Sequence, residues 1–568
     1  MRNDRLDRRR REFLCALSAL PLVGLGSCCA VRSPPSPVLP DAPFPSPLRR
    51  FLRPERIVRS ASKPTFAIDV HAHFFNASDV NVAGFVSESV AHAMDEPSRS
   101  FAIALSGVLD SLAGTASTAQ DEYATLLKKA GSPQDFSATD MQKALDNEID
   151  ARQQDIANRL YNEMVRQRAD AAFKRAAQND QERSASPNST PELSPESILD
   201  AMQSGIRVTA RSANNTKSAP DGKAKGLLRF AGYMLQERWM NLRLYSQAYS
   251  SSDNAFGIDA AFGALVDFDY WFDCSCHSAR RDQMKIQSLL SHLSGGYMLP
   301  LISYNPWTDI KDNGASFSLV VSAIEEYGFI GVKIYPPMGF FAYGNSNTPV
   351  KTKYARPDLT QLDAKLAQLF DWCTKNNVPV MAHTNASLGR DTASDSFGGV
   401  RGWSALLARY AGQPSSPLVN LGHFGGDIAE MGSQWPTDFA KLMAKAPNNR
   451  LYGDLAYWSA ARECLLQGSP LCTDLRNRLK SAESAYPGLR DRLMYGSDWV
   501  MLSQEQDWKI FPQEIALATS NDTTLTPEGL FYRNALECFG LTRTGFQHDR
   551  IIARLGLAPE EVPAWLNQ

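Results

Sequence analysis

Short apolar runs that alternate with amphipathic stretches are the feature that most constrains the fold of this chain. After a first run at 66–73, such runs recur at 264–268, 298–303, 329–335, 378–383, 418–423, 450–455 and 493–498. Strands separated by helical segments are typical of βαβ units and a parallel sheet. Counted together, the eight runs are the number that a closed (β/α)8 barrel requires, with an open sheet as the alternative.

A helix is predicted between the fourth and fifth runs. Its apolar residues recur at helical spacing and are Leu362, Leu366, Leu369, Phe370 and Cys373. Such a stripe is typical of a helix that packs on the outside of a sheet or barrel.

Polar residues of the types used in catalysis follow several of the apolar runs. They are His71, His73, Lys333, His383, His423 and Asp498. Alternation along a strand places His71 and His73 on the same face, and the carboxyl ends of barrel strands meet at one rim. We therefore expect the six side chains to converge. A hydrogen-bonded core histidine, a lysine that extends to solvent and a helix-capping aspartate are the structural alternatives.

Five segments, taken as an ordered set, resemble the amidohydrolase superfamily, in its amidohydrolase-related branch of metal-dependent hydrolases and decarboxylases. They are Asp-Val-His-Ala-His-Phe at 69–74, Gly-Val-Lys-Ile-Tyr-Pro-Pro at 331–337, Met-Ala-His at 381–383, Gly-His-Phe-Gly-Gly at 422–426 and Tyr-Gly-Ser-Asp-Trp at 495–499. The resemblance covers residues 64–85 and 258–540. It implies an α/β fold, a (β/α)8 TIM barrel with a long helical insertion after the first strand.

The resemblance also implies a metal site. Its ligands would be His71, His73, His383 and Asp498, a set of three imidazoles and one carboxylate that suits zinc and can take manganese, iron or cobalt. A water at the open position would become acidic on the ion. Asp498 would take the proton of that water and deliver it to the leaving group, and His423 would polarise the substrate carbonyl or orient the water.

Lys333 departs from this pattern, because a free ammonium would repel the ion. It would point aside, bind an anionic part of the substrate, or be carboxylated and bridge two metals, with His423 as a further ligand. We expect one zinc ion.

Aromatic and amide side chains follow the predicted strands and are candidates for substrate contact. They include Tyr335, Asn305, Trp307 and Trp499, which would suit a flat or aromatic small molecule. Packing of the loops against one another explains the same residues without a ligand.

The segment between the first and second strands is far too long for a barrel loop. We predict a barrel of residues 63–85 and 258–545, a helical insertion at 86–257 and a C-terminal tail at 546–568. A long amphipathic helix is marked by Leu145, Ile149, Ile156, Leu160 and Met164, and Ser194 and Pro195 begin another after a Ser/Pro-rich break. The insertion leaves the barrel on its catalytic rim, so it would cover the site as a lid or serve as a docking or oligomerisation surface.

The N-terminal residues are typical of an export signal. Arginines at 8–11 precede an uncharged apolar run at 13–26 that is about half the length needed to cross a bilayer. Residues 10–14 resemble a twin-arginine motif, and residues 25–28 resemble a lipoprotein processing site with Cys28 as the acylated residue. We predict a signal peptide at 1–27 and a Pro/Ser-rich tether at 28–62, on an exported, lipid-anchored protein of the periplasm or cell surface.

Cysteines and charge add two expectations. An oxidising compartment permits disulfides, for which Cys464 with Cys472, or Cys274 with Cys276, are local candidates. The formal net charge is −2, and the body carries no basic stripe, so we do not expect nucleic acid as a partner. A homo-oligomer is compatible with the sequence.

Three functions follow from this reading. The first is a metal-dependent hydrolase that cleaves a C–O or C–N bond of a small, aromatic or apolar molecule. The second is a nonoxidative decarboxylase that uses the same ligands. The third is a surface lipoprotein that keeps the barrel as a scaffold, which would have no need of the metal-ligand residue types.

Overall fold

Eight parallel strands pair in sequence order in the computed structural model, which describes residues 48–568 except 55–64, 132–137, 185–191, 205–221, 251–255, 273–275, 348–349, 351–355, 387, 428–433, 447, 467, 506 and 521–523. The strands are β1 (Ile68–Ala72), β2 (Ala260–Ala264), β3 (Met298–Ser303), β4 (Gly331–Ile334), β5 (Val380–His383), β6 (Leu418–Gly422), β7 (Arg450–Asp454) and β8 (Leu493–Met494). All seven neighbouring pairs are parallel.

The chain just after β8 returns to β1 and nearly closes the barrel. The amide of Val70 donates to the carbonyl of Tyr495 at 3.1 Å, and the amide of Asp498 donates to the carbonyl of His71 at 2.7 Å. Ala72 and Trp499 form a further parallel bridge. The predicted TIM barrel is therefore confirmed, and its closure places Asp498 directly beside β1.

The second strand is displaced from its predicted position. The prediction placed it at 264–268, whereas β2 ends at Ala264. Its residues are mostly small, and a Cβ on Gly263 would lie 3.0 Å from the Phe74 ring and from the Met298 sulfur. Small side chains are required here because neighbouring side chains fill the space, and this requirement weakens the β-strand signal in the sequence.

Helices surround the barrel in the order expected of βα units. They are α10 (Arg280–Leu293), α11 (Pro306–Lys311), α12 (Ala315–Glu326), α13 (Leu359–Lys375), α14 (Thr392–Asp395), α15 (Val400–Arg409), α16 (Trp435–Lys445), α17 (Pro470–Ala485), α18 (Phe511–Thr519) and α19 (Asn534–Cys538). The five apolar residues predicted for the stripe at 362–373 are all buried on α13, as expected.

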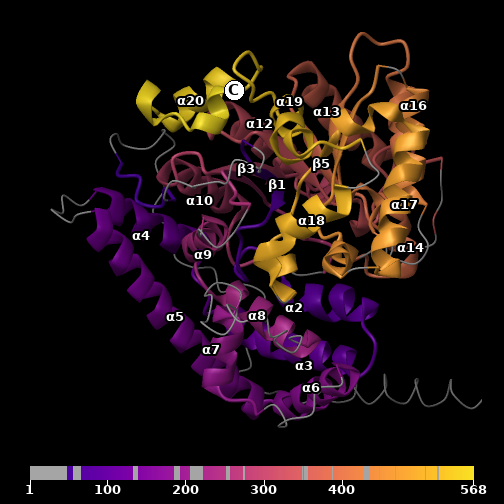
Figure 1. The fold of residues 1–568 in the computed structure, drawn as a ribbon. Helices are drawn as coiled ribbons and strands as arrows, with labels where there is room; N and C mark the ends of the chain where they lie inside the picture. The colour runs from indigo at the N-terminus through magenta and orange to yellow at the C-terminus, as the bar shows by residue number, and fades with distance from the viewer. Residues whose placement is uncertain are drawn as a thin grey trace, which may run out of the picture. The chain divides into compact units, whose positions relative to one another are not determined.

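The C-terminal residues pack against the barrel and are not a separate tail, which corrects the division at 546. Helix α20 (His548–Leu555) and the turns after it bury Ile551, Leu555 and Trp565 in one core cluster with the barrel residues Phe262 and Leu301. Figure 1 shows α20 at the top of the view, far from the insertion helices α3 (Ser98–Ala113) and α6 (Ala169–Ser184) at the bottom. This segment therefore closes the end of the barrel that lies away from the strands' carboxyl ends.

The long segment between β1 and β2 is helical. Its elements are α2 (Val82–Gly84), the π-helical turn η2 (Phe85–Val90), the short turn η3 (Ala91–Ala93), α3 (Ser98–Ala113), α4 (Ala119–Gly131), α5 (Ala138–Arg166), α6 (Ala169–Ser184), α7 (Pro195–Gln203), α8 (Lys223–Leu235) and α9 (Arg238–Ser250). The apolar residues predicted for the long helix are buried on α5. Ser194 caps α7 by accepting from the amide of Ser197, as predicted.

A buried ion network holds this insertion to the barrel. The guanidinium of Arg238 at the start of α9 donates to Asp79 in the loop after β1, at 2.6 and 2.7 Å. It also donates to Glu122 on α4 at 2.7 Å, and all three side chains are at most 1% exposed. Burial of both carboxylates beside one cation fixes α4 and α9 against the first barrel loop.

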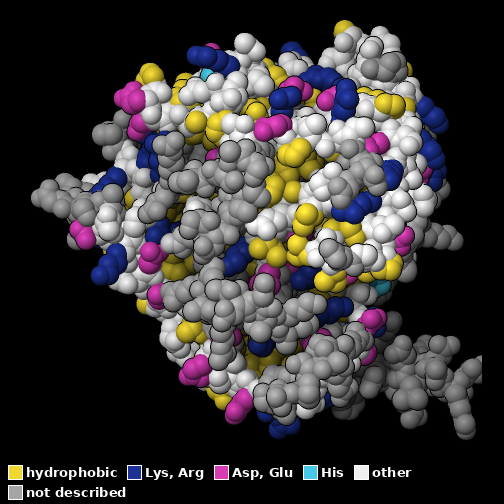
Figure 2. All heavy atoms as spheres, viewed as in Figure 1, with side chains coloured by type: hydrophobic (Ala, Val, Ile, Leu, Met, Phe, Trp, Pro, Cys, Tyr) yellow, Lys and Arg dark blue, Asp and Glu magenta, His cyan; other side chains and the backbone are white. Residues whose placement is uncertain are grey.

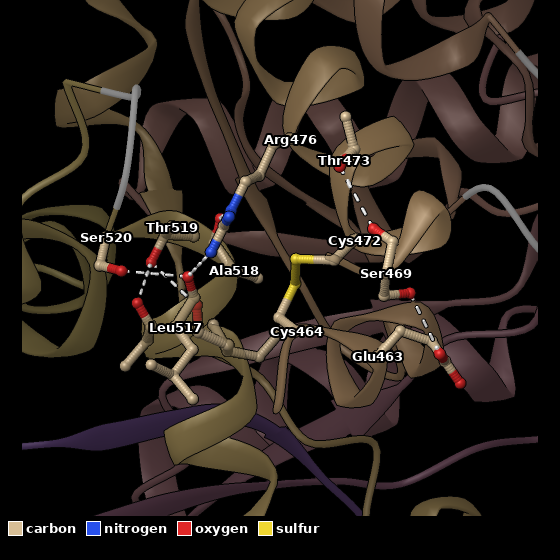
Figure 3. The surroundings of a disulfide bond; sticks show 12 residues. Glu463, Cys464, Ser469, Cys472, Thr473, Arg476, Leu517, Ala518, Thr519 and Ser520 are labelled. Carbon is tan, nitrogen blue, oxygen red and sulfur yellow. Dashed lines mark hydrogen bonds between the residues drawn. A yellow bond between two sulfur atoms is a disulfide. The ribbon is translucent and has the colours of Figure 1, made fainter. Parts of the chain in front are cut away.

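A disulfide joins Cys464 and Cys472, one of the two predicted pairs. It connects the 3-10 turn η7 (Ser459–Leu465) to α17 (Figure 3). Arg476 on α17 reaches past it and donates to the carbonyl of Leu517 on α18 at 2.8 Å. The crosslink therefore lies where the loop after β7 meets two outer helices. The alternative pair includes Cys274, which lies outside the described residues.

The predicted signal peptide, Cys28 and most of the tether also lie outside the described residues. Within the part of the chain that the structure describes, no helix is both long and apolar enough to span a bilayer. On the face drawn in Figure 2, basic and acidic side chains of the described residues are interspersed.

Candidate metal centre

The six residues predicted at the strand ends lie in one cluster. The Nε2 atom of His73 is 3.1 Å from Oδ1 of Asp498, and Nε2 of His71 is 3.8 Å from the same oxygen. The ring centroids of His71 and His423 are 4.8 Å apart, and those of His423 and His383 are 4.4 Å apart. Side chains from β1, β5, β6 and the loop after β8 therefore meet at the carboxyl rim of the barrel, as expected from the topology.

Three of the imidazoles are held by their Nδ1 atoms. His73 contacts the carbonyl oxygen of Ala264 at 2.7 Å, and His423 contacts that of Ala456 at 2.9 Å. A carbonyl oxygen only accepts, so each Nδ1 must carry the proton. With Nδ1 protonated, the ligand atom that each ring can offer to a metal at the centre is Nε2.

His71 is held in the same way by a carboxylate. Its Nδ1 lies 3.2 Å from Oδ2 of Asp454, while its Nε2 lies 2.9 Å from Nζ of Lys333. Burial, followed by the charge of Lys333, lowers the pKa of His71 to about 3, so its ring is neutral at physiological pH. An ammonium can only donate a hydrogen bond, so Nε2 of His71 accepts from Lys333.

The donor atoms fit a divalent metal. One ligand atom each from His71, His423 and Asp498 lies within 4.8 Å of the other two, and all three residues are buried. The buried Nε2 of His423 has no hydrogen-bond partner among the described residues. A buried lone pair without a donor is costly, and an ion bound by these residues would satisfy it. The geometry thus brings His423 as close to the centre as the predicted ligands.

Asp498 is the anionic member of the cluster. Burial alone would raise the pKa of this carboxyl, but its close contact with His73 and the neighbouring imidazoles of His423 and His71 together lower it to about 2. The carboxylate is therefore ionised at neutral pH and can bind a cation or take up a proton that a reaction delivers to it.

Lys333 lies inside the cluster and does not extend to solvent. Its side chain is 1% exposed, and its Nζ also contacts the sulfur of Met381 at 3.4 Å. Burial lowers the pKa of Lys333 to about 8. Of the three alternatives for this residue, a side chain that points away from the site does not fit these contacts.

Two positions in the centre have left-handed backbone. His423 has a φ of 65° and Asp498 has a φ of 59°, which for non-glycine residues costs on the order of 1–3 kcal/mol each. Packing on both sides maintains these conformations. For Asp498, the hydrogen bond from its backbone amide to the His71 carbonyl directs the carboxylate toward the imidazoles.

Two aspartates that support the centre were not predicted. Asp454 ends β7 and accepts from the amide of His423 at 2.9 Å as well as contacting His71. Asp69 accepts from the amides of His71 and Ser497, both at 3.0 Å, and from the hydroxyl of Tyr245 on α9 at 2.6 Å. The position of Asp454 at the end of an apolar run was a signal for it, whereas nothing in the local sequence pairs Asp69 with Tyr245.

A cavity opens from the centre, with about 480 Å³ of empty space that includes open solvent at its mouth. Its lining includes His73, Lys333, His383 and Asp498 on the barrel side, and Tyr335, whose ring stacks on that of His383 at 4.5 Å. Residues of α8 and of the segment 80–85 complete the lining. Residues between β1 and β2 therefore form part of the cavity wall.

Of the four residues predicted to contact substrate, Tyr335 lines this cavity, and Asn305, Trp307 and Trp499 do not. Asn305 caps α11 by accepting from the amide of Trp307 at 2.9 Å, and its own amide donates to the carbonyl of Asp269. Trp307 is buried on the same helix. Trp499 is fully buried and packs against the rings of Phe74 and Tyr245. Loop packing accounts for these residues.

Comparison with known proteins gives one family match. Residues 319–541, which are less than half of the chain, match the model of a family described as amidohydrolase. This region contains Lys333, His383, His423 and Asp498, whereas His71 and His73 lie outside it. No curated protein matches the chain.

Several solved structures are similar at low identity. An uncharacterized TIM-barrel protein from Bordetella bronchiseptica is 14% identical, with a TM-score of 0.32, over 56% of this chain and 84% of that one. An amidohydrolase from Burkholderia multivorans with bound zinc is 12% identical, with a TM-score of 0.33, over 50% and 83%. A 5-carboxyvanillate decarboxylase from Novosphingobium aromaticivorans with bound manganese is 13% identical, with a TM-score of 0.31, over 61% and 92%. The barrel assignment itself rests on the strand pairing described above.

Proposed function

We propose that this protein is a metal-dependent hydrolase that cleaves a C–O or C–N bond of a small molecule. The observation that carries the proposal is the orientation of the imidazoles. The Nδ1 atoms of His71, His73 and His423 are all engaged by acceptors, so the Nε2 atom of each ring is left to serve as a ligand beside the Asp498 carboxylate. A barrel that served only as a scaffold would not require this arrangement.

The chain offers His71, His73, His383, His423 and Asp498 to hold the ion, and zinc is the expected metal, with manganese, iron or cobalt as alternatives. When bound, a divalent ion lowers the pKa of water and polarises a carbonyl. A single ion is the simplest occupancy, and a carboxylated Lys333 would accommodate a second.

The residues around the ion supply proton transfer and orientation. Asp498 is ionised and has one oxygen 3.1 Å from His73, which leaves the carboxylate able to accept a proton and return it to the leaving group. His423 orients the reacting group from the β6 side. Lys333 lies in the cavity lining, where it can hold an anionic oxygen of the substrate.

This position of Lys333 also favours a second candidate, a nonoxidative decarboxylase. A carboxylate held by a buried amine at the closed end of an apolar cavity would be oriented for loss of carbon dioxide. The two candidates share the metal centre and differ in whether water enters the product.

The test uses the full chain loaded with zinc and then with manganese, in water enriched in ¹⁸O. Lactones, aryl esters, amides and aromatic carboxylic acids are supplied separately. We expect ¹⁸O in the product of an ester, lactone or amide, and loss of that turnover in Asp498→Asn. Release of carbon dioxide without ¹⁸O uptake would contradict hydrolysis and support the decarboxylase.

We further propose that the protein is exported and anchored by lipid at Cys28. The disulfide between Cys464 and Cys472 supports this, because disulfides persist in oxidising compartments. In a bacterial host, we expect the wild-type protein to take up labelled palmitate and to fractionate with membranes, and Cys28→Ser to do neither. A Cys28→Ser protein that remains labelled would contradict the proposal, with Cys373→Ser as the matched control.

A further inference from the structure

The cavity that opens from the metal centre has two chemically different ends. The end at the barrel rim carries polar groups, namely His73, Lys333, Tyr335, His383 and Asp498. The rest of the lining is entirely apolar and consists of Phe75, Val80, Val82, Phe85, Phe230, Met234, Val266, Phe268, Leu388 and Met501. A ligand that fills the cavity would therefore place its reacting group at the rim and an apolar body against this wall.

The insertion provides the part of the wall that faces the barrel. Val82 and Phe85 come from α2 and η2, and Phe230 and Met234 come from α8. Phe230 is 2% exposed and Met234 is fully buried. Phe85 stacks on Phe268 of the loop after β2, with ring centroids 5.6 Å apart. These four insertion residues are called the apolar roof below.

The apolar roof is fixed to the loop that carries Asp498. The guanidinium of Arg229 on α8 donates to the carbonyls of Ser503 and Glu505, at 2.9 and 3.0 Å. Gly226, one turn earlier on α8, approaches the Gln504 carbonyl so closely that a Cβ would lie 2.0 Å from the oxygen. The position of Phe230 and Met234 relative to the centre is thus set by direct backbone contacts, so the shape of the cavity is defined before a ligand binds.

Charge in the lining is confined to the rim. Lys333 and Asp498 are both within the metal-site cluster, and neither the roof nor the rest of the apolar wall contains an ionisable side chain. A charged or strongly hydrated group placed there would lose its hydration without a partner, which costs several kcal/mol. Ligands with a second ionised group away from the reacting end are therefore excluded.

We propose that the apolar roof selects a substrate whose reacting group is attached to one compact, uncharged, apolar body about the size of a six-membered ring. Phe85, Phe230 and Met234 would be specificity-determining residues. The empty space of about 480 Å³ counts open solvent at the mouth, where Leu388 and Met501 are partly exposed, so the enclosed part is much smaller and leaves room for one ring at most. This inference rests on the metal-dependent function proposed above, because the reacting end is defined by the metal centre.

The test measures binding of hydroxamic acids to the zinc-loaded full chain by calorimetry, because a hydroxamate chelates the ion without being turned over. Acetohydroxamic acid reports on the metal centre alone, and benzohydroxamic acid adds the ring. Burial of the ring at about 25 cal/mol per Å² predicts that benzohydroxamic acid binds at least about tenfold more tightly. The 4-carboxy derivative of benzohydroxamic acid should lose that advantage, because its carboxylate would be placed against the apolar roof and would lose its hydration without gaining a partner.

Two variants test the roof, one that changes the cavity volume and one that keeps it. Phe230→Ala enlarges the cavity and should let 2-naphthohydroxamic acid bind more tightly than benzohydroxamic acid, reversing the wild-type order. Met234→Leu keeps the volume and should preserve that order. Val165→Ala, at a residue of α5 that is 47% exposed, is the matched control for a truncation elsewhere in the insertion and should also preserve it.

The outcomes separate the two proposals. If zinc does not bind, neither hydroxamate binds, and both the proposed function and this inference are overturned. If acetohydroxamic acid binds but benzohydroxamic acid binds no more tightly, or if the order in Phe230→Ala is unchanged, the metal centre stands and the role of the roof is refuted.

Discussion

At the scale of the residue, the centre depends on side chains that orient the histidines. Asp454, the last residue of β7, is buried and contacts both His71 and the backbone of His423. Burial alone would raise the pKa of this carboxyl, but the imidazole of His71 lowers it below its ordinary value, so Asp454 remains an anion that fixes the tautomer of His71. Carboxylates in this position raise the basicity of a ligating imidazole.

Replacement of Asp454 by Asn should therefore weaken zinc binding by about 10- to 100-fold while the chain remains folded. Competition with a chromogenic chelator measures the affinity, and circular dichroism monitors the fold. Asp363→Asn is the matched control. Asp363 on α13 also accepts from backbone amides, those of Asn345 and Ser346, but it does not contact a histidine of the centre. Equal zinc affinity in Asp454→Asn and wild type would show that Asp454 does not support the ligand.

Other residues of the centre show what a sequence can and cannot reveal. Histidines at strand ends are recognisable because alternation and barrel topology fix where they point, and all four that were expected lie in the cluster. Asp69 is different, because its partner Tyr245 comes from an insertion helix 176 positions later in the chain. Asn305, Trp307 and Trp499 were assigned to substrate because amide and aromatic residues follow the predicted strands, but Asn305 caps α11, and Trp307 and Trp499 are buried outside the cavity lining.

At the scale of the element, the sequence patterns located most of the strands and three of the helices, α5, α7 and α13. The apolar stripe of α13 and the capping serine of α7 are local signals, so they could be read directly. Strand β2 was misplaced because its small residues give a weak strand signal. They are required by contacts with Phe74, which is distant in sequence, and with Met298, which lies beyond a helix. The packed C-terminal segment was missed although α20 has a regular apolar face, because nothing in the local sequence shows that this face packs against the barrel.

The close approach of α8 to the loop after β8 gives a prediction for this element. A Cβ at position 226 would lie 2.0 Å from the Gln504 carbonyl oxygen, so Gly226→Ala must move the helix. We expect it to lower the free energy of unfolding by about 1–3 kcal/mol, although alanine favours helix formation. Urea denaturation of the full chain measures this change.

Gly107→Ala on α3 is the control for that variant. Its added Cβ would meet only the end of the Gln167 side chain at 3.0 Å, which can move. We expect it to be neutral or to stabilise the protein by up to about 1 kcal/mol. The account of α8 would be wrong if the two variants had the same effect on unfolding.

At the scale of the whole molecule, the insertion and the barrel are one packed structure. Arg238, Asp79 and Glu122 are buried together, and Tyr245 on α9 bonds to Asp69 beside the metal centre. The insertion thus covers the cavity and also supports the first strand. Its presence was evident from the length between the first two strands, whereas these contacts depend on side chains that no local pattern connects.

Loss of the Arg238 guanidinium from this network should lower the stability of the whole fold. Arg238→Met leaves two buried carboxylates without their partner, and we expect a loss of about 3–5 kcal/mol in the free energy of unfolding. Thermal and urea denaturation measure it. Arg159→Met, which removes an ion pair in which Arg159 is 47% exposed, should cost less than about 1 kcal/mol. A small effect of Arg238→Met would show that the insertion is held by apolar packing instead.

The central claim is that the histidines and Asp498 bind a metal ion, and the metal content of the purified full chain tests it most directly. After reconstitution with zinc and removal of excess ion, elemental analysis should find about one equivalent in the wild-type protein. The His71→Ala variant, shown to be folded by circular dichroism, should retain much less. A wild-type protein that retains no zinc, manganese, iron or cobalt after reconstitution, or a His71→Ala variant that retains as much as wild type, would contradict the account.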